Sequence, residues 1–386
     1  MANFLQEILI WKEATPSVIP TSPTCYGLKA ESFGIATPQD SETNNELGGG
    51  RGASAKSFGA VNVSGDIGMI WNSDNAPILF THAIGAATST ANATSDTWSA
   101  TTVVTKGDLI NHSDGVHTLA CYVGGTTGSS EPDLAAYATG PEGRGIRVTD
   151  GTATWIIMPL LVEQSGVRSD CLESFGLETR HDDTCGVSSP QYCRYTGMYI
   201  NTLPLSISGT MKALKSSAGT IGMAEEDSLL VTAYEAMSAK SGYTNTELIS
   251  DYFLLGECTA YLDGTPISLK VTTFDGTINN SVSMDDALNS LKVDNVGIVS
   301  VDGSIKMILD TTMYADAAAH SDKDFKFTFQ KDNGCLMEIQ FPQAKLEKTY
   351  KESLTDKTTM LTIPWSAFDT SSEYSVRWRT ISPTSY

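Results

Sequence analysis

Basic residues are scarce in this 386-residue chain, which has 25 lysines and arginines against 45 aspartates and glutamates. The resulting formal net charge of −20 excludes proteins that grip nucleic acid, because such binding draws on clustered lysine and arginine. Two interpretations of the acidity remain open. It only keeps the protein in solution, or it provides a surface along which a polyanion slides without sticking.

Long apolar runs are also missing. The longest extends from Trp155 to Val162, is interrupted by Pro159, and is far too short to span a bilayer. The first residues, MANFLQEILIWKEATP, have Glu7 inside the apolar stretch and no basic residue before it, so they lack the pattern of a signal peptide. We therefore expect neither export nor a membrane partner.

Cysteine pairs at metal-binding spacing are absent. The seven cysteines are an odd number at scattered positions, which is untypical of a disulfide framework and indicates reduced thiols in a product made in the cytoplasm. The tightest group supplies zinc-type ligands but contains no CxxC pair, so ordinary buried thiols are the preferred interpretation. This group is Cys171, His181, Cys185 and Cys193.

Catalytic motifs are equally hard to find. The chain has no GxSxG, and its five histidines form no recognisable triad. Adjacent acidic pairs occur at 182–183, 225–226 and 285–286, but neighbouring residues of a strand point to opposite faces, so these pairs do not suit a glycosidase. We predict a protein without enzymatic activity and without cofactors.

One heptapeptide occurs twice, as ESFGIAT at 31–37 and ESFGLET at 173–179. Each copy precedes a second echo, NVSGDIG (62–68) or SISGTMK (206–212), and a third version, SVDGSIK, occurs at 300–306. Gly34 lies 31 residues before Gly65, and Gly176 lies 33 residues before Gly209, so the spacing also matches. The pattern predicts a duplicated structural unit.

The unit is predicted to be β, because apolar residues alternate with small polar ones around each echo. Gly65, Gly209 and Gly303 occupy the apolar rows, which predicts a bend, a bulge or a close approach of two backbones. Residues 37–56 are polar and glycine-rich and are predicted to form a long mobile loop. Helices are predicted at 225–242, with a second candidate at 244–256 and a weak capping pattern at Ser283.

A stretch of different character separates the first unit from the second. From about Thr94 to Met158, short strand-like segments alternate with glycine, serine and proline turns. We predict three parts: 1–93, an inserted β-module at 94–160, and 161–386. The order of Trp98, Gly107, Tyr122, GGTTGSSEPDL and VTDGTATW resembles a small module found in phage tail proteins and fibres. Asp133 and Leu134 stand where that pattern usually has an aromatic–proline pair, which puts a ligand pocket in doubt.

The frame around the insertion also resembles a known family. VNVSGDIG with NAPILFTHAIG (75–85), YTGMYINTLPLSISGTM (195–211) and DFKFTFQKDNGCLMEIQFPQAKLEK (324–348) are similar to parts of siphophage tail tube proteins. The resemblance covers about 20–90 and 165–370. It implies a mainly β protein, with a duplicated sandwich or barrel and one or two helices, that forms stacked hexameric rings for genome ejection. Strands of neighbouring subunits would complete an inner barrel.

The resemblance also implies roles for particular residues. Asp66, Ser208, Thr210 and Asp302 are expected opposite the core and are candidates to face the channel. Contacts between rings are expected from the N-terminal segment and the 37–56 loop, whose candidate residues are Asp40, Glu42, Glu46 and Arg51. The module is expected on the outer surface, where Trp98, Tyr122 and Trp155 either stack on host glycans or form its core.

The implied partners are other copies of the chain, a tape measure protein, terminator or tip proteins, and double-stranded DNA that passes without specific binding. The implied location is the virion tail, after assembly in the host cytoplasm. A glycan-binding adhesin or receptor-binding tail component is the alternative function.

Overall fold

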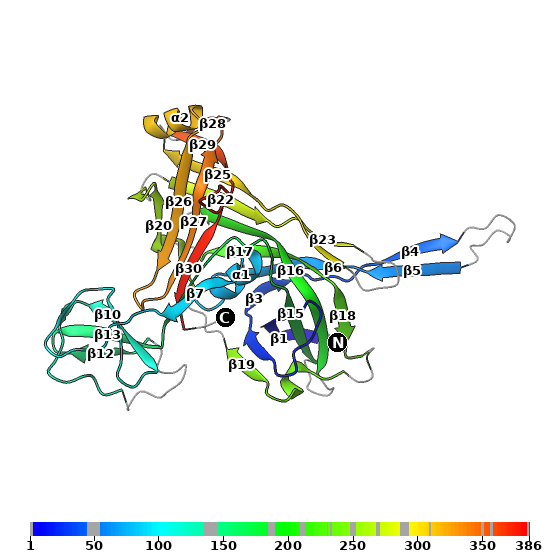
Figure 1. Cartoon of the computed structure of the whole chain (residues 1–386), viewed down its shortest axis with the longest axis horizontal. Coiled ribbons are helices and arrows are strands. Elements are labelled where there is room, and N and C mark those ends of the chain that lie inside the picture. Colours follow the sequence, from blue (N-terminus) through cyan, green and yellow to red (C-terminus); the bar gives the residue numbers. More distant parts are fainter. Residues whose placement is uncertain are drawn as a thin grey trace.

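The computed structural model describes residues 3–44, 55–134, 145–183, 190–208, 213–229, 231, 234–247, 252–267, 271–285, 293–308, 310–348, 351–355, 358–383 and 386. Strands dominate, and two α-helices occur within these ranges (Figure 1). The fold is mainly β, as the alternating pattern predicts.

The first sheet has eight antiparallel strands, which form two groups of four neighbouring strands. In spatial order they are β3 (Ala30–Phe33), β6 (Val63–Ile70), β17 (Lys215–Gly222), β16 (Gln191–Ser208), β22 (Val271–Asn279), β25 (Ser300–Ile308), β29 (Thr358–Ala367) and β28 (Lys351–Thr355).

The second sheet packs on one face of the first. Its order is β21 (Thr265–Pro266), β20 (Cys258–Leu262), β26 (Asp322–Gln330), β27 (Leu336–Leu346), β30 (Arg377–Ser382), β14 (Val162–Val167) and β7 (Ala87–Asn92). Aromatic rings fill the space between the two sheets: the ring of Phe274 lies 4.0 Å from that of Phe327 and 5.2 Å from that of Trp365. The two sheets therefore form a sandwich with one continuous core.

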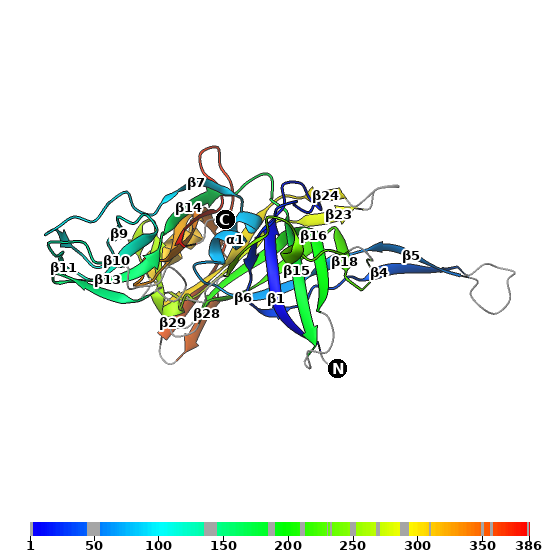
Figure 2. The same cartoon turned by 90° about the horizontal axis from the view of Figure 1, so that it is seen from below.

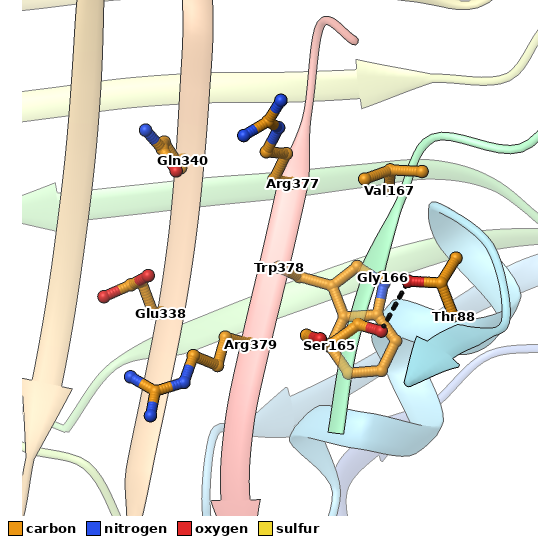
Figure 3. Close-up of a pocket in the computed structure, with 9 residues that line it drawn as sticks. All are labelled: Thr88, Ser165, Gly166, Val167, Glu338, Gln340, Arg377, Trp378 and Arg379. Carbon is orange, nitrogen blue, oxygen red and sulfur yellow. Dashed lines mark hydrogen bonds between the residues drawn. The ribbon is translucent and has the colours of Figure 1, made fainter. Parts of the chain in front are cut away.

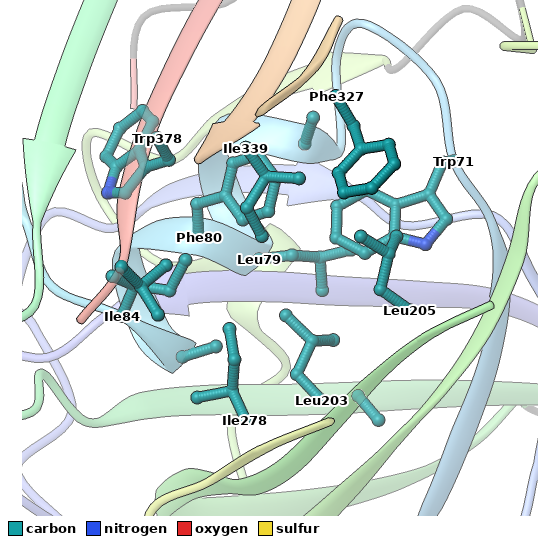
Figure 4. Close-up of a cluster of buried hydrophobic side chains, with 14 of the residues drawn as sticks. Trp71, Leu79, Phe80, Ile84, Leu203, Leu205, Ile278, Phe327, Ile339 and Trp378 are labelled. Carbon is teal, nitrogen blue, oxygen red and sulfur yellow. The ribbon is translucent and has the colours of Figure 1, made fainter. Parts of the chain in front are cut away.

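Helix α1 (Ala76–Ala83) lies inside this sandwich, and all eight of its residues are buried. Figure 4 shows Leu79 and Phe80 of the helix between Leu203 and Ile278 of the first sheet and Ile339 of the second. A helix that is buried on all sides has no amphipathic pattern, so sequence periodicity did not reveal it. The second helix, α2 (Thr311–Ala318), begins at Asp310, whose carboxylate accepts hydrogen bonds from the Thr312 and Met313 amides.

A third group of strands shares β16 with the first sheet. Its order is β19 (Thr244–Glu247), β2 (Thr24–Gly27), β1 (Asn3–Lys12), β15 (Phe175–Asp183), β16 and β18 (Ala224–Asp227). Short 3-10 turns occur at η2 (Met237–Ala239) and η3 (Leu255–Glu257).

The helices predicted at 225–242 and 244–256 are wrong wherever these residues are described. Glu226 lies in β18, opposite Arg194, and β19 pairs with β2. The buried carboxylate of Glu178 accepts hydrogen bonds from the Tyr234 hydroxyl and from the Met237 amide. These tertiary bonds override the helical pattern, and the described residues form the short strand β18, irregular backbone and the 3-10 turn η2 instead of an α-helix. Ser283, the weak cap candidate, lies in strand β23 (Val282–Asp285).

The duplication is visible within the first sheet. Phe33 of β3 faces Ile67 of β6, and a bulge separates Ala30 from Ser32. In the same way Phe274 of β22 faces Ile305 of β25, and a bulge separates Val271 from Thr273. Each strand pair is interrupted by a hairpin and followed by a helix. The hairpins are β4 (Gln39–Asn44) with β5 (Ala55–Val61) and β23 with β24 (Val293–Val296).

The strand glycines occupy equivalent places in the two repeats. A Cβ atom on Gly65 would overlap the carbonyl oxygen of Gly34, and one on Gly303 would overlap that of Asp275. Two backbones therefore approach closely at each site, one of the three alternatives that the sequence left open. Gly209 lies outside the described residues.

The two copies of ESFG do not mark equivalent strands. The first lies on β3, whereas the second leads into β15, which pairs with β1 and β16. There a Cβ on Gly176 would overlap the indole of Trp11. The structural counterpart of 62–68 is the third echo, 300–306, so the duplication is real but its second copy starts later in the chain.

The expected 37–56 loop is wrong as a loop, because most of its described residues form the β4–β5 hairpin. Both hairpins project toward the same side of the first sheet, and β4–β5 extends farther (Figures 1 and 2).

Candidate functional site

The outward face of the first sheet is lined by small polar side chains. Its rows are fixed by register: Asp66 pairs with Gly219, Gly219 with Thr202, and Thr202 with Asn279. Because directly paired residues of antiparallel strands share a face, these rows run across the sheet. We call this the polar face. Its exposed or half-exposed residues include Ser64, Asp66, Thr202, Ser206, Ser208, Thr273, Asp275, Thr277, Asn279, Ser300, Asp302, Ser304, Thr362 and Ser366.

Three of the four residues expected opposite the core lie on the polar face. Asp66, Ser208 and Asp302 are exposed there, and Thr210 lies outside the described residues. Asp275 is a further acidic residue of the polar face that the sequence did not single out, and its carboxylate accepts a 2.6 Å hydrogen bond from Ser206. Its alternation was present in the TTFDGTINN segment and could have identified it.

The side chains described on the polar face carry a small excess of negative charge; Lys351, whose side chain is not described, is in register with this face. Against the three aspartates stand Lys215 and Lys306, and the Lys215 ammonium is paired with the Glu31 carboxylate at 2.5 Å. The serine and threonine side chains are short and project little above the sheet. A polyanion near this face would meet repulsion and few donors able to clamp phosphate.

The outward face of the second sheet has a different chemistry. Long charged side chains form ion pairs there: Arg379 Nε lies 2.6 Å from Glu163 Oε1, and Lys326 Nζ lies 3.7 Å from Glu338 Oε2. Figure 3 shows Arg377 and Arg379 on the side of β30 opposite Trp378, whose indole points into the core. The two outward faces of the sandwich thus differ in side-chain length and in charge balance.

A family model for phage tail tube proteins matches residues 4–367. This chain belongs to that family. No curated protein matches it. The tail tube protein is therefore a structural component of the phage virion tail, from a family that is not enzymatic and that assembles with itself and with other tail proteins.

Residues 97–159 of the tail tube protein carry a separate small sheet. Its order is β12 (Arg147–Asp150), β13 (Ala153–Pro159), β10 (His117–Val123) and β9 (Leu109–Asn111), beside the pair β8 (Val103–Val104) and β11 (Gly125–Thr126). Alternate residues of β13 pack on two cores. Trp155 and Ile157 face the inside of the small sheet, whereas Ile156 and Met158 pack against Leu336. Burial on both faces explains the apolar run at 155–162.

The small sheet rests on the second sheet of the sandwich, on its outward face. Leu336 and Ile381 pair across β27 and β30, and both contact the small sheet. Their neighbours Met337 and Thr380 point into the sandwich and are fully buried. An ion pair of 2.8 Å between Lys106 and Asp332 joins the two bodies. The small sheet therefore lies on the side of the molecule opposite the polar face.

The aromatic residues of the small sheet are largely covered. Trp155 is completely buried, and its indole N–H and that of Trp98 both donate to one carboxylate oxygen of Asp150, at 3.2 and 2.8 Å. The Arg147 guanidinium covers the ring of Tyr122 at 3.8 Å. Trp155 thus has no face available for stacking on a sugar, and Trp98 and Tyr122 are only half-exposed.

The remaining candidates bring no chemistry together in the described ranges. Asp40 and Glu42 lie on β4, their side chains are not described, and Glu46 and Arg51 fall outside the described residues. Glu226 forms a 3.1 Å ion pair with Arg194, and Asp285 is an exposed residue of β23. Among described residues, no group of His, Cys, Asp or Glu is placed to hold a metal, and no helix could cross a membrane. Six cysteines are described as free thiols, whereas Cys185 is not described.

Proposed function

We propose that copies of this siphophage-type tail tube protein join into rings, and that the rings stack into a tube whose channel is lined by the polar face. The observation that carries the proposal is the contrast between the two outward faces of the sandwich. A wall of short hydroxyl and carboxylate side chains leaves room for a DNA duplex and offers few cationic contacts. The face with long paired charges would then lie outside.

The expected hexameric ring is proposed to contain six copies of the repeated four-stranded unit, not six chains. Each chain supplies this unit twice in one eight-stranded sheet. Since strands are about 4.8 Å apart and tilted, 24 strands enclose a barrel roughly 45 Å across between backbones, and 48 strands double that width. The narrower barrel suits a duplex, which is on the order of 20 Å wide. Three chains supply six units, whereas six chains would supply twelve.

Stacking is assigned to the hairpins. The β4–β5 hairpin continues the direction of β6 beyond the edge of the sheet, and β23–β24 projects to the same side (Figure 2). Both could therefore reach the next ring along the channel. The N-terminal segment contributes to the same contact in this proposal. Tape measure, terminator and tip proteins would meet the ends of the tube, after assembly in the host cytoplasm.

The part comprising 94–160 is proposed as a module on the outer wall. The support is its position on the outward face of the second sheet, away from the polar face. The chain enters and leaves it through β7 and β14, in which Asn92 pairs with Val162. Two antiparallel neighbours can be joined by a two-residue Asn-Gly turn, so the module can be removed without stretching the wall.

Electron microscopy of the purified protein tests the proposal. We expect rings or tubes whose symmetry gives the number of chains. Deleting 40–51 should leave a folded protein that no longer polymerises, whereas replacing 94–160 by Asn-Gly should leave narrower tubes. Normal tubes from the hairpin deletion would contradict the stacking role. A monomer that binds or cleaves polysaccharide would contradict the tube and favour an adhesin.

The lining is tested separately by charge. Asp302→Lys places a cation on the polar face, and Asp322→Lys makes the same change at an exposed position of β26 in the second sheet. Tubes of the first variant should retain short duplex DNA in a nuclease-protected, salt-sensitive form. The second should behave as the parent does. Equal DNA retention by both variants would rule out the polar face as the lining.

A further inference from the structure

The eight-stranded sheet has two open ends. Among the residues that the structure describes, β3 pairs with β6 on one side, and β28 pairs with β29 on one side. The opposite edge of each strand presents backbone N–H and C=O groups to whatever lies beyond, which makes it a template for another strand. The two edges are at opposite ends of one sheet, so they cannot pair with each other in the same chain (Figure 1).

The chain contains its own example of a junction between two units. The first unit ends at β16 and the second begins at β22, and these strands pair antiparallel. Pro204 faces Thr277, Ser206 faces Asp275, and Ser208 faces Thr273.

Strand β22 is the counterpart of β3, as the shared bulge shows. Phe274 corresponds to Phe33, because both face the equivalent isoleucine of the next strand. It follows that Thr277 corresponds to Ala36 and Asp275 to Gly34. The bridge between Ala36 and Ser64 extends the β3 pairing far enough to include both positions.

Strand β28 is the counterpart of the last part of β16. Thr220 faces Gly65 in the first unit, and Trp365 faces Gly303 in the second, so β17 corresponds to β29. Each is followed across the sheet by its own hairpin partner, β16 or β28. Lys351 faces Thr362. In the first unit the β16–β17 register pairs Thr202 with Gly219. Continued by two residues along each strand, this register brings Pro204 to the position that Lys351 occupies in the second unit.

We infer that β28 of one copy pairs antiparallel with β3 of the next copy and reproduces the β16–β22 junction. In this register Lys351 faces Ala36, Ser353 faces Gly34, and Thr355 faces Ser32. The inference rests on the proposed function, because only a ring brings the two edges together. All six positions fall on the polar face, so the junction would continue the rows of the lining without a break. The small Ser32, Gly34 and Ala36 suit such a seam.

Cysteine pairs test the register in assembled protein. Directly opposed residues have Cα atoms about 4.5–5.5 Å apart, which is within the range of a disulfide. Lys351→Cys with Ala36→Cys should therefore give chains of disulfide-linked copies after mild oxidation of tubes. The matched control, Lys351→Cys with Ser32→Cys, moves one thiol by four residues, about 13 Å along the strand, and should give none. Single variants account for the native thiols.

The outcomes separate this inference from the function itself. Tubes that cross-link only with the in-register pair support the junction. Tubes that cross-link equally with the control pair, or with neither pair, overturn it and leave the tube function standing. Failure of the parent protein to form rings would instead overturn the function. If the cysteine variants do not assemble, hydrogen exchange of the parent decides: assembly should protect the amides of 30–36 and 351–355, and unchanged exchange there would refute the junction.

Discussion

His82 should make the folded chain sensitive to mild acid. It ends the last turn of α1 and is completely buried. Its Nδ1 lies 2.9 Å from the Glu173 carbonyl oxygen, and its Nε2 lies 2.6 Å from the Tyr386 hydroxyl. Because a carbonyl can only accept, Nδ1 carries the proton, and Nε2 accepts from Tyr386. Both bonds are compatible with a neutral ring, in which Nε2 carries no proton.

Burial lowers the pKa of His82 from 6.5 to about 4, although the bond to Glu173 opposes the change. Between these two pH values the unfolded chain binds a proton that the folded chain does not. The free energy of unfolding therefore decreases as the pH falls through this window. At about 1.4 kcal/mol per pH unit, lowering the pH from 7.5 to 5.0 removes about 2 kcal/mol, and lowering it to 4 removes about 3 kcal/mol.

Urea unfolding of the unassembled chain at pH 7.5 and 5.0 measures this loss. His82→Gln should be less stable at pH 7.5 but should lose about 2 kcal/mol less on acidification than the parent. His320→Gln, at an exposed position after α2, is the control and should keep the parent's pH dependence. Burial raises the pKa of Glu13, which acts with the opposite sign, but this contribution is common to all three proteins and cancels.

Equal pH dependence in the parent and His82→Gln would refute the reasoning. If His82→Gln does not fold, the imidazole resonances of the parent decide the question. Those of His82 should not titrate between pH 7 and 5, and a titration near pH 6.5 would show that burial does not govern this group.

Three further predictions concern stability. Gly303→Ala should cost about 2–4 kcal/mol in chemical unfolding, because its Cβ meets the Asp275 carbonyl. Gly27→Ala should cost less than 1 kcal/mol, because the nearest atoms to its Cβ would be 3.9 Å away, and similar losses in the two variants would contradict the close approach. Arg194→Met should cost about 3–5 kcal/mol, because it removes the guanidinium that lies 2.9 Å from the buried Glu178 carboxylate and leaves that charge without a cation. Adding Glu178→Leu should restore much of the lost stability, and no recovery would contradict the ion-pair explanation. Asp150→Ala should destabilise the small sheet alone, by about 1–3 kcal/mol for each donor that loses its acceptor. Tryptophan fluorescence should shift to the red and proteolysis should occur near 100–155, while tubes still form. Loss of tubes would contradict an independent module.

Local pattern was enough to predict the strands of the polar face. Alternation around Asp66, Ser208 and Asp302 reported directly which side chains leave the core, because a strand has a period of two whatever it packs against. The repeated heptapeptide and the glycine-bearing echoes predicted the duplication. They did not reveal which strands correspond, since that depends on register: Phe33 matches Phe274 by a shared bulge, not by a shared heptapeptide.

The helix predictions were wrong because contacts between residues distant in the sequence overrode the local pattern. The 225–242 segment has a helical spacing of apolar residues, yet Glu178 and Arg194, far away in the sequence, hold Tyr234 and Glu226 in place. Helix α1 was hidden because it is enclosed by both sheets and has no exposed side. The hairpin at β4–β5 was hidden because its residues are polar and glycine-rich, which is typical of a loop.

The sequence alone determined the β class, the acidic and small-residue character of one strand face, and the presence of a repeat, because these depend on composition and on neighbours along the chain. Only the tertiary structure decided that the two units share one sheet, that the small sheet sits on the opposite side of the sandwich, and that two strand edges have no partner strand among the described residues. Those facts depend on which distant strands pair, and backbone hydrogen bonds are alike at every residue, so pairing is selected by the packing of the whole core.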